Sequence, residues 1–247
     1  MKKFGLIGYP LSHSFSKKHF SEKFLKEEIT DCGYELYPME NISSFPELIV
    51  ADEEILGINV TIPHKVGVMA YLNDLDEAAA EIGAVNCVDI RRVNGKAVLK
   101  GFNTDAYGFE ASLVPFLKSH HTKALVFGDG GAAKAVKYVL NKLGISFLVV
   151  TRKPAEGTIL YEAVDEKLLQ EYTVLINTTP LGMSPNVDSC PPIPYESITE
   201  KHLAYDLVYN PELTKFLEQS AASGAAIKNG LEMLYLQAER SWYIWNS

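Results

Sequence analysis

The feature that most constrains the fold of this chain is a short apolar run, Lys123–Phe127, that leads directly into a cluster of glycines and a helical stretch. This order predicts a strand, a tight turn and a helix. Gly128 permits the turn, Gly130 lets the backbone approach a pyrophosphate, and small Ala133 allows close packing of helix and strand. A pyrophosphate would then bind the N–H groups at the start of the helix. Because glycines also form ordinary turns, the glycine cluster alone does not distinguish a nucleotide-binding turn from an ordinary one, and the flanking segments have to be considered.

A second apolar run, Ile145–Val150, follows Gly144, which is suited to end a helix of about eleven residues that begins near Ala132. These segments complete a β-α-β unit. An NAD-binding unit usually places Asp or Glu after the second strand to bind the ribose 2′-hydroxyl, but this chain has Thr151-Arg152-Lys153. Two cations suit a 2′-phosphate, because a guanidinium binds phosphate in a bidentate manner, so the sequence favours NADP over NAD. The alternative is a solvated basic turn.

Composition narrows the class of protein further. The 247 residues, 47% of them apolar, are enough for about two domains. A net charge of −8 argues against a nucleic-acid or membrane partner, and the short apolar run at the N-terminus is no signal peptide, so we expect a cytoplasmic protein. The three cysteines and six histidines show no metal-ligand spacing, so no metal is predicted.

The order of the apolar segments predicts an α/β protein of two domains. Residues 1–103 with 231–247 are expected to form a substrate domain with a mostly parallel sheet, and residues 104–230 a Rossmann-type NADP-binding domain, with a last helix returning to the first domain. Asn94-Gly95 predicts a two-residue hairpin turn that places an antiparallel pair at the edge of the first sheet. Other expected strands are Phe4–Ile7, Tyr34–Tyr37, Ile55–Val60, Thr173–Ile176, Leu203–Val208 and Ala225–Lys228; expected helices are Ser16–Glu28, Lys65–Leu72, Thr104–Leu117 and one from about Leu231.

Polar clusters follow the ends of predicted strands, where open α/β sheets bind their ligands. Ser12–Ser16 follows the first strand: Ser14 lies too early to cap the next helix and favours a functional role, whereas Ser16 suits either role equally. Asn59, Thr61 and Lys65 follow another strand. Asn86 and Asp105 are expected to reach the same cleft, although Asp105 also suits a plain helix N-terminus.

Taken together, these segments resemble the shikimate dehydrogenase family, the NADP-dependent enzymes that reduce 3-dehydroshikimate to shikimate. The resemblance covers nearly the whole chain. The matching segments are G-Y-P-L-S-H-S-F-S from Gly8, N-V-T-I-P-H-K from Asn59, G-A-V-N-C from Gly83, G-F-N-T-D from Gly101, G-D-G-G-A-A from Gly128, T-R-K from Thr151, N-T-T-P-L-G-M from Asn177, D-L-V-Y-N-P from Asp206 and G-L-E-M-L-Y-L-Q from Gly230. Thr151 replaces the Asn that is usual before the arginine.

The resemblance implies two sets of binding residues. Those that would contact the hydroxyacid are Ser14, Ser16, Thr61, Lys65, Asn86, Asp105, Tyr209 and Gln237, with Asn59 supporting Lys65. Those that would contact the cofactor are Gly128, Asp129, Gly130, Gly131, Ala132, Thr151, Arg152, Lys153, Thr178, Leu207, Gly230 and Met233. Without the resemblance, core packing for Tyr209 and a surface amide for Gln237 would be the better interpretations.

The expected chemistry is hydride transfer to a ketone, which leaves an alkoxide that needs a proton. The Lys65 ammonium could supply it, and Asp105 could orient the ammonium and accept a hydrogen bond from the substrate. Three alternatives remain: a quinate/shikimate dehydrogenase that uses NAD, a non-catalytic metabolite-binding homologue, and a folate-dehydrogenase-like enzyme, which the serine pair does not suit. The expected partners are the small-molecule substrate and the cofactor, in a monomer or homodimer.

Overall fold

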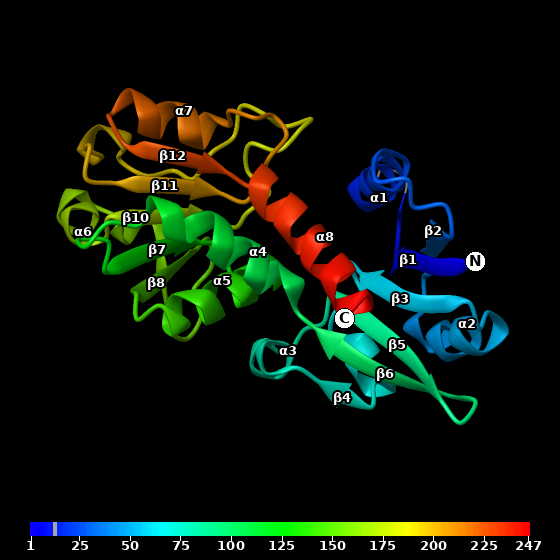
Figure 1. The fold of residues 1–247 in the computed structure, drawn as a ribbon. Helices are drawn as coiled ribbons and strands as arrows, with labels where there is room; N and C mark the ends of the chain where they lie inside the picture. The colour runs from blue at the N-terminus through cyan, green and yellow to red at the C-terminus, as the bar shows by residue number, and fades with distance from the viewer. Residues whose placement is uncertain (12–13) are drawn as a thin grey trace. The chain divides into compact units, whose positions relative to one another are not determined.

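The protein consists of two compact units, shown in Figure 1. The computed structural model describes residues 1–11 and 14–247; Ser12 and His13 of the predicted polar segment lie outside the described residues. The first unit comprises Met1–Thr104 and Ala238–Ser247, and the second comprises Asp105–Gln237. Each unit is built on its own six-stranded sheet, which agrees with the predicted α/β fold class.

The sheet of the first unit has the order β2-β1-β3-β5-β6-β4. Its strands are β1 (Lys2–Gly8), β2 (Cys32–Pro38), β3 (Ile55–Val60), β4 (Asp74–Leu75), β5 (Cys87–Val93) and β6 (Lys96–Phe102). β1 runs parallel to both β2 and β3, whereas β5 is antiparallel to β3 and to β6. The carboxyl ends of β1 and β3 therefore lie together, and the polar segments that follow them begin at the same edge of the sheet.

The predicted hairpin is confirmed at its turn but not in its position. Asn94 and Gly95 join β5 to β6 with positive φ angles of 52° and 76°, the combination that a type I′ turn requires. The pair does not end the sheet, because β4 pairs in parallel with β6 and forms the edge. A strand of two residues is too short to show an alternating pattern, so β4 could not be predicted from the sequence.

Helix α1 (Phe15–Lys26) begins one residue earlier than predicted. Its N-cap is Ser14, whose hydroxyl oxygen accepts a hydrogen bond from the Lys17 N–H at 3.3 Å. The expectation that Ser14 lies too early to cap a helix is therefore wrong, and Ser16 lies in the first turn instead.

The remaining helices of the first unit are short. They are α2 (Phe45–Ala51) and α3 (Glu77–Ile82). The α-helix predicted over Lys65–Leu72 is wrong: a 3-10 helix occupies Gly67–Tyr71. Gly67 and its β-branched neighbours Val66 and Val68 are poor helix formers, so the segment keeps the tighter turn used in short pieces.

Helix α8 (Leu231–Trp245) ends in the first unit, where Trp245 packs against the sheet. The indole N–H of Trp245 donates to the Val88 carbonyl at 3.0 Å, and the ring stacks on Phe4 with centroids 4.9 Å apart. A Cβ atom at Gly57 would lie 2.3 Å from the indole nitrogen. Gly57 therefore leaves the space into which this tryptophan fits.

The sheet of the second unit is parallel throughout, with the order β12-β11-β10-β7-β8-β9. Numbered within the unit, this is the order 3-2-1-4-5-6 of a Rossmann fold. Its strands are β7 (Lys123–Phe127), β8 (Ser146–Thr151), β9 (Thr158–Leu160), β10 (Val174–Asn177), β11 (Leu203–Asp206) and β12 (Ala226–Asn229). The strand order reverses between β7 and β10: β7 to β9 follow one another toward one edge of the sheet, and β10 to β12 toward the other edge. Folds of this kind bind their ligands at that point.

Helices cover both faces of this sheet. They are α4 (Thr104–Leu113), α5 (Gly131–Lys142), α6 (Glu166–Glu171) and α7 (Lys215–Ala222). Phe127 on β7 belongs to the same buried cluster as Leu169 of α6 and Phe216 of α7, whereas Tyr205 of β11 contacts Phe109 and Ser112 of α4. The helix predicted over Thr104–Leu117 ends at Leu113, because Pro115 cannot donate a backbone hydrogen bond; a 3-10 helix over Val114–Phe116 follows.

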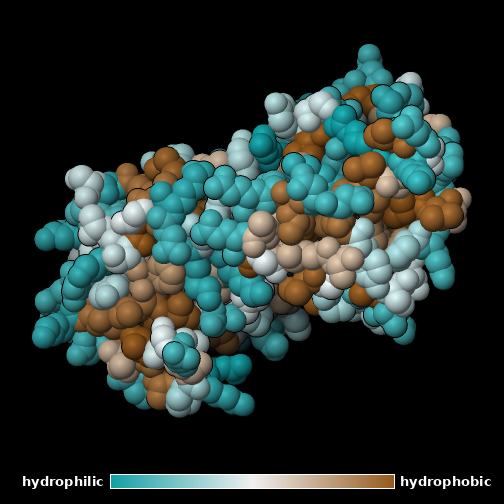
Figure 2. Space-filling view, turned by 90° about the horizontal axis from the view of Figure 1, so that it is seen from below, coloured by the Kyte–Doolittle hydropathy of each residue, from teal (hydrophilic) through white to brown (hydrophobic). Residues whose placement is uncertain are grey.

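The surface is mixed in character. On the face shown in Figure 2, hydrophobic and hydrophilic side chains are interspersed. Among large hydrophobic side chains, Leu25, Val50 and Ile62 are 83%, 80% and 73% exposed, and they come from three separate segments. Singly exposed apolar residues are usual on a protein surface. Within the described residues, no helix is both long and apolar enough to cross a membrane.

Candidate functional site

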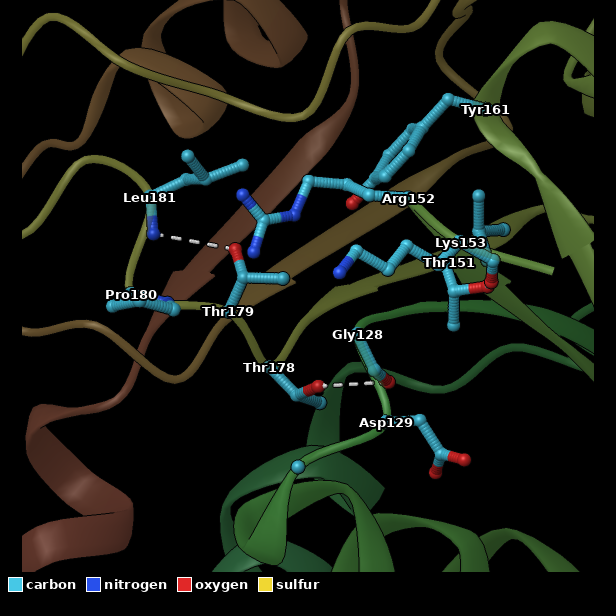
Figure 3. A pocket seen from close by; sticks show the side chains of 12 residues that line it. Gly128, Asp129, Thr151, Arg152, Lys153, Tyr161, Thr178, Thr179, Pro180 and Leu181 are labelled. Atoms are coloured by element: carbon cyan, nitrogen blue, oxygen red, sulfur yellow. Dashed lines mark hydrogen bonds between the residues drawn. The ribbon is translucent and has the colours of Figure 1, made fainter. Parts of the chain in front are cut away.

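A pocket of about 460 Å³ lies in the second unit, at the carboxyl ends of β7, β8 and β10 (Figure 3). Seven residues predicted to contact a cofactor line it: Gly128, Asp129, Gly130, Thr151, Arg152, Lys153 and Thr178. The other lining residues are Val150, Tyr161, Thr179, Pro180 and Leu181, which the sequence did not indicate. The glycine turn and the basic turn, more than twenty residues apart in the chain, therefore face the same space.

Gly128 is required by the backbone and by its neighbours. Its φ angle of +97° disfavours every residue with a side chain, and a Cβ atom there would lie 2.7 Å from Cγ2 of Thr179. Thr178 also holds the backbone at Gly128. Its hydroxyl donates to the Phe127 carbonyl oxygen at 2.8 Å and lies 3.2 Å from the Gly128 carbonyl oxygen. Figure 3 shows the second of these contacts.

Gly130 and Gly131 are not required by protein packing. A Cβ atom at either position would meet no protein atom within 4 Å among the described residues, and neither has a positive φ angle. Gly130 is the N-cap of α5, with no side chain to bind the N–H groups of the first turn, in which Ala132 follows. A pyrophosphate needs open space in front of the N-terminus of a helix, where its oxygens can accept from free N–H groups. The N-terminus of α5, a helix of twelve residues, provides this space, so these residues fit a dinucleotide.

The turn after β8 is shaped by Thr151. Its hydroxyl lies 2.8 Å from the Lys153 carbonyl, to which it donates, and 3.1 Å from the Thr158 hydroxyl at the start of β9. Arg152 and Lys153 are exposed and line the pocket. Thr151 therefore acts on this site by fixing the turn that carries the two cations.

Tyr161 forms the wall beside the basic turn. Its ring stacks on Phe127 with centroids 6.0 Å apart. Burial raises the pKa of Tyr161 to about 12, while the positive charge of nearby Arg152 opposes the shift. Asp129 is oriented toward α5 instead, where its carboxylate pairs with Lys137 at 2.5 Å. The pocket thus has cations at one end and open helix N–H groups at the other, as a phosphate-rich ligand requires.

Other residues predicted to contact the cofactor lie outside the lining of this pocket. Leu207 and Gly230 contact each other closely: a Cβ atom at Gly230 would lie 2.1 Å from the Leu207 carbonyl oxygen. Met233 lies in α8, where its carbonyl would be 2.6 Å from a Cβ atom at Gly108 of α4. Of the residues predicted to contact the substrate, Tyr209 is 39% exposed after β11, and the Gln237 side-chain amide donates to the Leu234 carbonyl at 2.9 Å.

In the first unit, the polar segments after β1 and β3 are held together by their backbones. The Thr61 N–H donates to the Ile7 carbonyl at 2.9 Å, and the Tyr9 N–H donates to the Ile62 carbonyl at 3.1 Å. A Cβ atom at Gly8 would lie 2.4 Å from the Thr61 methyl group. This explains why a glycine ends β1.

A buried polar network connects several predicted substrate residues. Asn59 accepts from the Tyr34 hydroxyl at 2.8 Å and donates to Ser241 at 2.9 Å and to the Asn86 carbonyl at 3.2 Å. The Asn86 side chain in turn accepts from the Thr104 N–H at 2.6 Å. Burial raises the pKa of Tyr34, and a hydrogen bond with Ser16 opposes that shift, so Ser16 belongs to the same network. Among the described residues, no buried side-chain polar atom lacks a partner.

The proposed catalytic residues fall in different units. Lys65 belongs to the first unit, where its carbonyl accepts from the Val85 N–H at 2.8 Å, one residue before Asn86. Asp105 lies in the first turn of α4 and is the first residue of the second unit. It directly follows Thr104, which Asn86 holds. The pairing of Lys65 with Asp105 stays a prediction.

The sequence missed residues that act through buried hydrogen bonds. Asn177 and Asp206 begin two of the segments quoted above, but no role was given to them; both are fully buried at the ends of β10 and β11. Tyr161 gave no signal, because it lies in a 3-10 helix beyond the short strand β9. In the part of the chain that the structure describes, no group of three or more His, Cys, Asp or Glu side chains is placed to hold a metal ion.

A parallel sheet of Rossmann order, an open glycine turn and a basic turn facing one pocket define a dinucleotide-binding protein. The comparisons with known proteins narrow this class. The family model for the shikimate dehydrogenase substrate binding domain matches residues 6–88. A shikimate dehydrogenase (NADP(+)) from Caldanaerobacter subterraneus is 36% identical, over 99% of this chain and 91% of the relative. The chain belongs to the shikimate dehydrogenase family.

Solved structures agree with this assignment. A chorismate mutase/shikimate 5-dehydrogenase fusion protein from Clostridium acetobutylicum is 36% identical, with a TM-score of 0.87 over 100% of this chain and 91% of that one. Shikimate 5-dehydrogenase from Thermus thermophilus, solved with NADP(H) and shikimate, is 32% identical, with a TM-score of 0.84 over 99% of this chain and 93% of that one.

Proposed function

We propose that the protein catalyses the NADPH-dependent, reversible reduction of 3-dehydroshikimate to shikimate, a step of aromatic amino acid (chorismate) biosynthesis. The observation that carries the proposal is the pocket of the second unit, in which an open glycine turn and the Arg152-Lys153 turn face one space. The family membership supplies the substrate: the relative from Thermus thermophilus was solved with both NADP(H) and shikimate.

We assign cofactor binding to residues 104–230 and substrate binding to residues 1–103 with 231–247. Gly130, Gly131 and Ala132 at the N-terminus of α5 would bind the pyrophosphate, and Arg152 and Lys153 the 2′-phosphate. Thr178, Leu207 and Gly230 complete the proposed contacts within residues 104–230, and Met233 adds one from α8. When bound, NADPH supplies the hydride that reduces the ketone.

For catalysis, we propose that Lys65 donates the proton that the alkoxide needs. An alkoxide is strongly basic, and an ammonium within hydrogen-bond reach neutralises it as it forms. Asp105 would hold that ammonium in place and accept a hydrogen bond from the neighbouring substrate hydroxyl. Asn59 would support Lys65 through the fixed geometry of β3, which the contacts with Tyr34 and Ser241 provide.

Substrate recognition is assigned to uncharged hydroxyl and amide side chains. Ser14, Ser16, Thr61 and Asn86 suit a carboxylate and ring hydroxyls, and Tyr209 and Gln237 would complete the set. A site built from such groups rejects a ligand that leaves them unpaired. The structure adds that Asn86 is 3% exposed and already bonded to Thr104, so its contribution includes holding the start of α4. The cytoplasmic location and the monomeric or dimeric state stay predictions.

The test is the absorbance of the reduced nicotinamide. Shikimate and quinate are each supplied with NADP and with NAD. We expect reduction with shikimate and NADP, and much slower reduction with NAD, because Arg152 and Lys153 stand where NAD-binding folds carry an acid. Equal rates with NAD would favour the broader quinate/shikimate dehydrogenase. No reduction at high protein concentration would favour a non-catalytic binding protein.

A further inference from the structure

A buried carboxylate lies beside the cofactor pocket and takes no part in the proposed chemistry. Asp206 ends β11 and is fully buried. Three donors of the second unit point at it: the Thr214 hydroxyl at 2.6 Å, the Asn177 amide at 2.9 Å and the Val208 N–H at 3.0 Å. Thr214 is itself fully buried and caps α7.

The partner of Asp206 across the sheet is Asn177, the last residue of β10. The Asn177 side-chain oxygen accepts from both the N–H and the hydroxyl of Thr179, at 3.1 and 2.6 Å. Its amide donates to Asp206 and to the Leu181 carbonyl, at 2.9 and 3.3 Å. Every hydrogen-bonding atom of this fully buried amide is therefore used, and Asp206 fixes which way the amide points.

These contacts determine the shape of the loop Thr178–Leu181. The loop is closed internally by the Leu181 N–H, which donates to the Thr179 hydroxyl at 3.2 Å (Figure 3). Thr178, Thr179, Pro180 and Leu181 all line the cofactor pocket, whereas Asn177 and Asp206 do not. The pair therefore acts on the pocket through the loop.

The same pair holds a second segment. The Leu207 N–H donates to the Asn177 carbonyl at 3.0 Å, Val208 donates to the Asp206 carboxylate, and the Val208 carbonyl accepts from the Gly230 N–H at 3.2 Å. Leu207 and Gly230 are both proposed cofactor contacts. One amide and one carboxylate thus connect two chain segments that both carry proposed cofactor contacts.

We propose that Asn177 and Asp206 are positioning residues for NADP binding, which act as one hydrogen-bonded unit on the loop Thr178–Leu181 and on the segment that begins at Leu207. The proposal rests on the proposed function, because NADP is the ligand whose affinity it concerns. The carboxylate is the better acceptor for three converging donors, since hydrogen bonds to a charged group are about twice as strong as neutral ones.

The experiment combines Asp206→Ala, Asn177→Ala, the double variant and the conservative Asp206→Asn. The dissociation constant for NADP is measured by calorimetry, and KM for NADP, KM for shikimate and kcat are measured by absorbance. Each alanine variant is expected to weaken NADP binding by about three- to thirty-fold, the range found for residues that act on a site without touching the ligand. KM for NADP should rise more than KM for shikimate.

Two further results are expected if the pair acts as a unit. The dissociation constant of the double variant for NADP should be at most about three-fold higher than that of the single variant with the lower affinity, because the effects of substitutions at coupled residues do not add. Asp206→Asn keeps an oxygen for Asn177 and Val208, and the Thr214 hydroxyl can turn to accept from the new amide. It should therefore recover most of the affinity that Asp206→Ala loses.

The control for a loss of stability alone is Ser220→Ala, which removes a fully buried hydroxyl of α7 that donates to the Phe216 carbonyl at 2.8 Å. It should lower the unfolding temperature and leave the affinity for NADP unchanged. The proposal is overturned if the variants at 177 and 206 behave like Ser220→Ala, or if their effects on NADP binding add. If the alanine variants do not fold, Thr214→Val takes their place, because it removes the shortest of the three hydrogen bonds that hold Asp206: weaker NADP binding supports the proposal, and wild-type affinity overturns it. Failure of the wild-type protein to bind NADP would instead overturn the proposed function.

Discussion

At the scale of single residues, the two glycines that open the cofactor pocket have different tasks. Gly128 is held at a positive φ angle against Thr179, so the fold itself needs it. Gly130 has an ordinary φ angle of −86° and empty space where a side chain would be. Packing within the described residues therefore gives no reason for a glycine at position 130, as expected if its backbone contacts a pyrophosphate.

Alanine substitutions separate these tasks. Gly128→Ala should lower the free energy of unfolding by about 1–3 kcal/mol, the usual cost of a strained backbone. Gly130→Ala should leave it within about 1 kcal/mol, since only a helix cap changes, yet weaken NADP binding at least about ten-fold. Urea denaturation and calorimetric titration measure the two quantities. An NADP affinity unchanged by Gly130→Ala would show that the backbone approach is not used.

Lys65 carries the proposed proton transfer. Lys65→Ala should lower kcat by about two to four orders of magnitude and leave KM nearly unchanged, as expected for a lost general acid. Lys100→Ala is the matched control, because Lys100 is a lysine of the same unit that pairs with Asp74 on β4. A Lys65→Ala enzyme with wild-type kcat would remove this lysine from the mechanism.

Asp206 should make stability depend on pH. Burial raises its pKa to about 6, although hydrogen bonds from Thr214, Val208 and Asn177 oppose the shift. The folded state therefore binds this proton more tightly than the unfolded state, whose group titrates near 3.8, so the contribution to stability is greatest below pH 3.8 and falls as the pH rises to 6. We expect the free energy of unfolding of wild type, relative to Asp206→Asn, to fall by about 2–3 kcal/mol between pH 4 and pH 7. Parallel pH curves for the two proteins would contradict this.

At the scale of elements, what could be predicted depended on how far the determining interactions extend. Asn94-Gly95 predicted its turn because the turn is decided by two residues. The α5 start was placed within one residue, since a glycine run precedes the periodic pattern. The start of α1 was misplaced. Ser14 and Ser16 can both cap a helix by residue type, so the sequence alone did not show which of them precedes the first turn.

The candidate site divides in the same way. The sequence could place the turn Thr151–Lys153 beside the pocket, because the turn directly follows the second strand of a β-α-β unit. Tyr161 could not, since it reaches the pocket only through the fold of a segment with no pattern. Asn177 and Asp206 could not either, because their bonds join neighbouring strands that lie far apart in the sequence.

The C-terminal turn of α8 should be essential for the first unit. Trp245→Ala removes a ring that is 6% exposed, stacked on Phe4 and hydrogen-bonded to Val88, and should cost about 3–5 kcal/mol of stability. Tyr243→Ala, two residues earlier and 62% exposed, should cost less than about 1 kcal/mol. Equal effects in urea denaturation would show that the indole does not hold the sheet.

At the scale of the whole molecule, two sheets in two compact units divide the proposed ligands between them. NADP at about one hundred times its dissociation constant should stabilise the unit that binds it by about 2.7 kcal/mol. Hydrogen exchange should therefore slow most in Asp105–Gln237, around the ends of β7, β8 and β10, and an Arg152→Ala protein should show less protection. Protection found only in Met1–Thr104 would contradict the assignment of the cofactor to the second unit.

The path of the chain through the two units also bears on synthesis at the ribosome. The second unit is one continuous stretch, Asp105–Gln237, whereas the first is completed only by Ala238–Ser247. Because the ribosome releases a chain from its N-terminus onward, all residues of the second unit are available before the last ten residues of the first unit. In the first unit, the space above Gly57 stays unfilled until Trp245 has been synthesised. The N-terminal half of this protein can thus reach its full native packing only after the second unit has been synthesised.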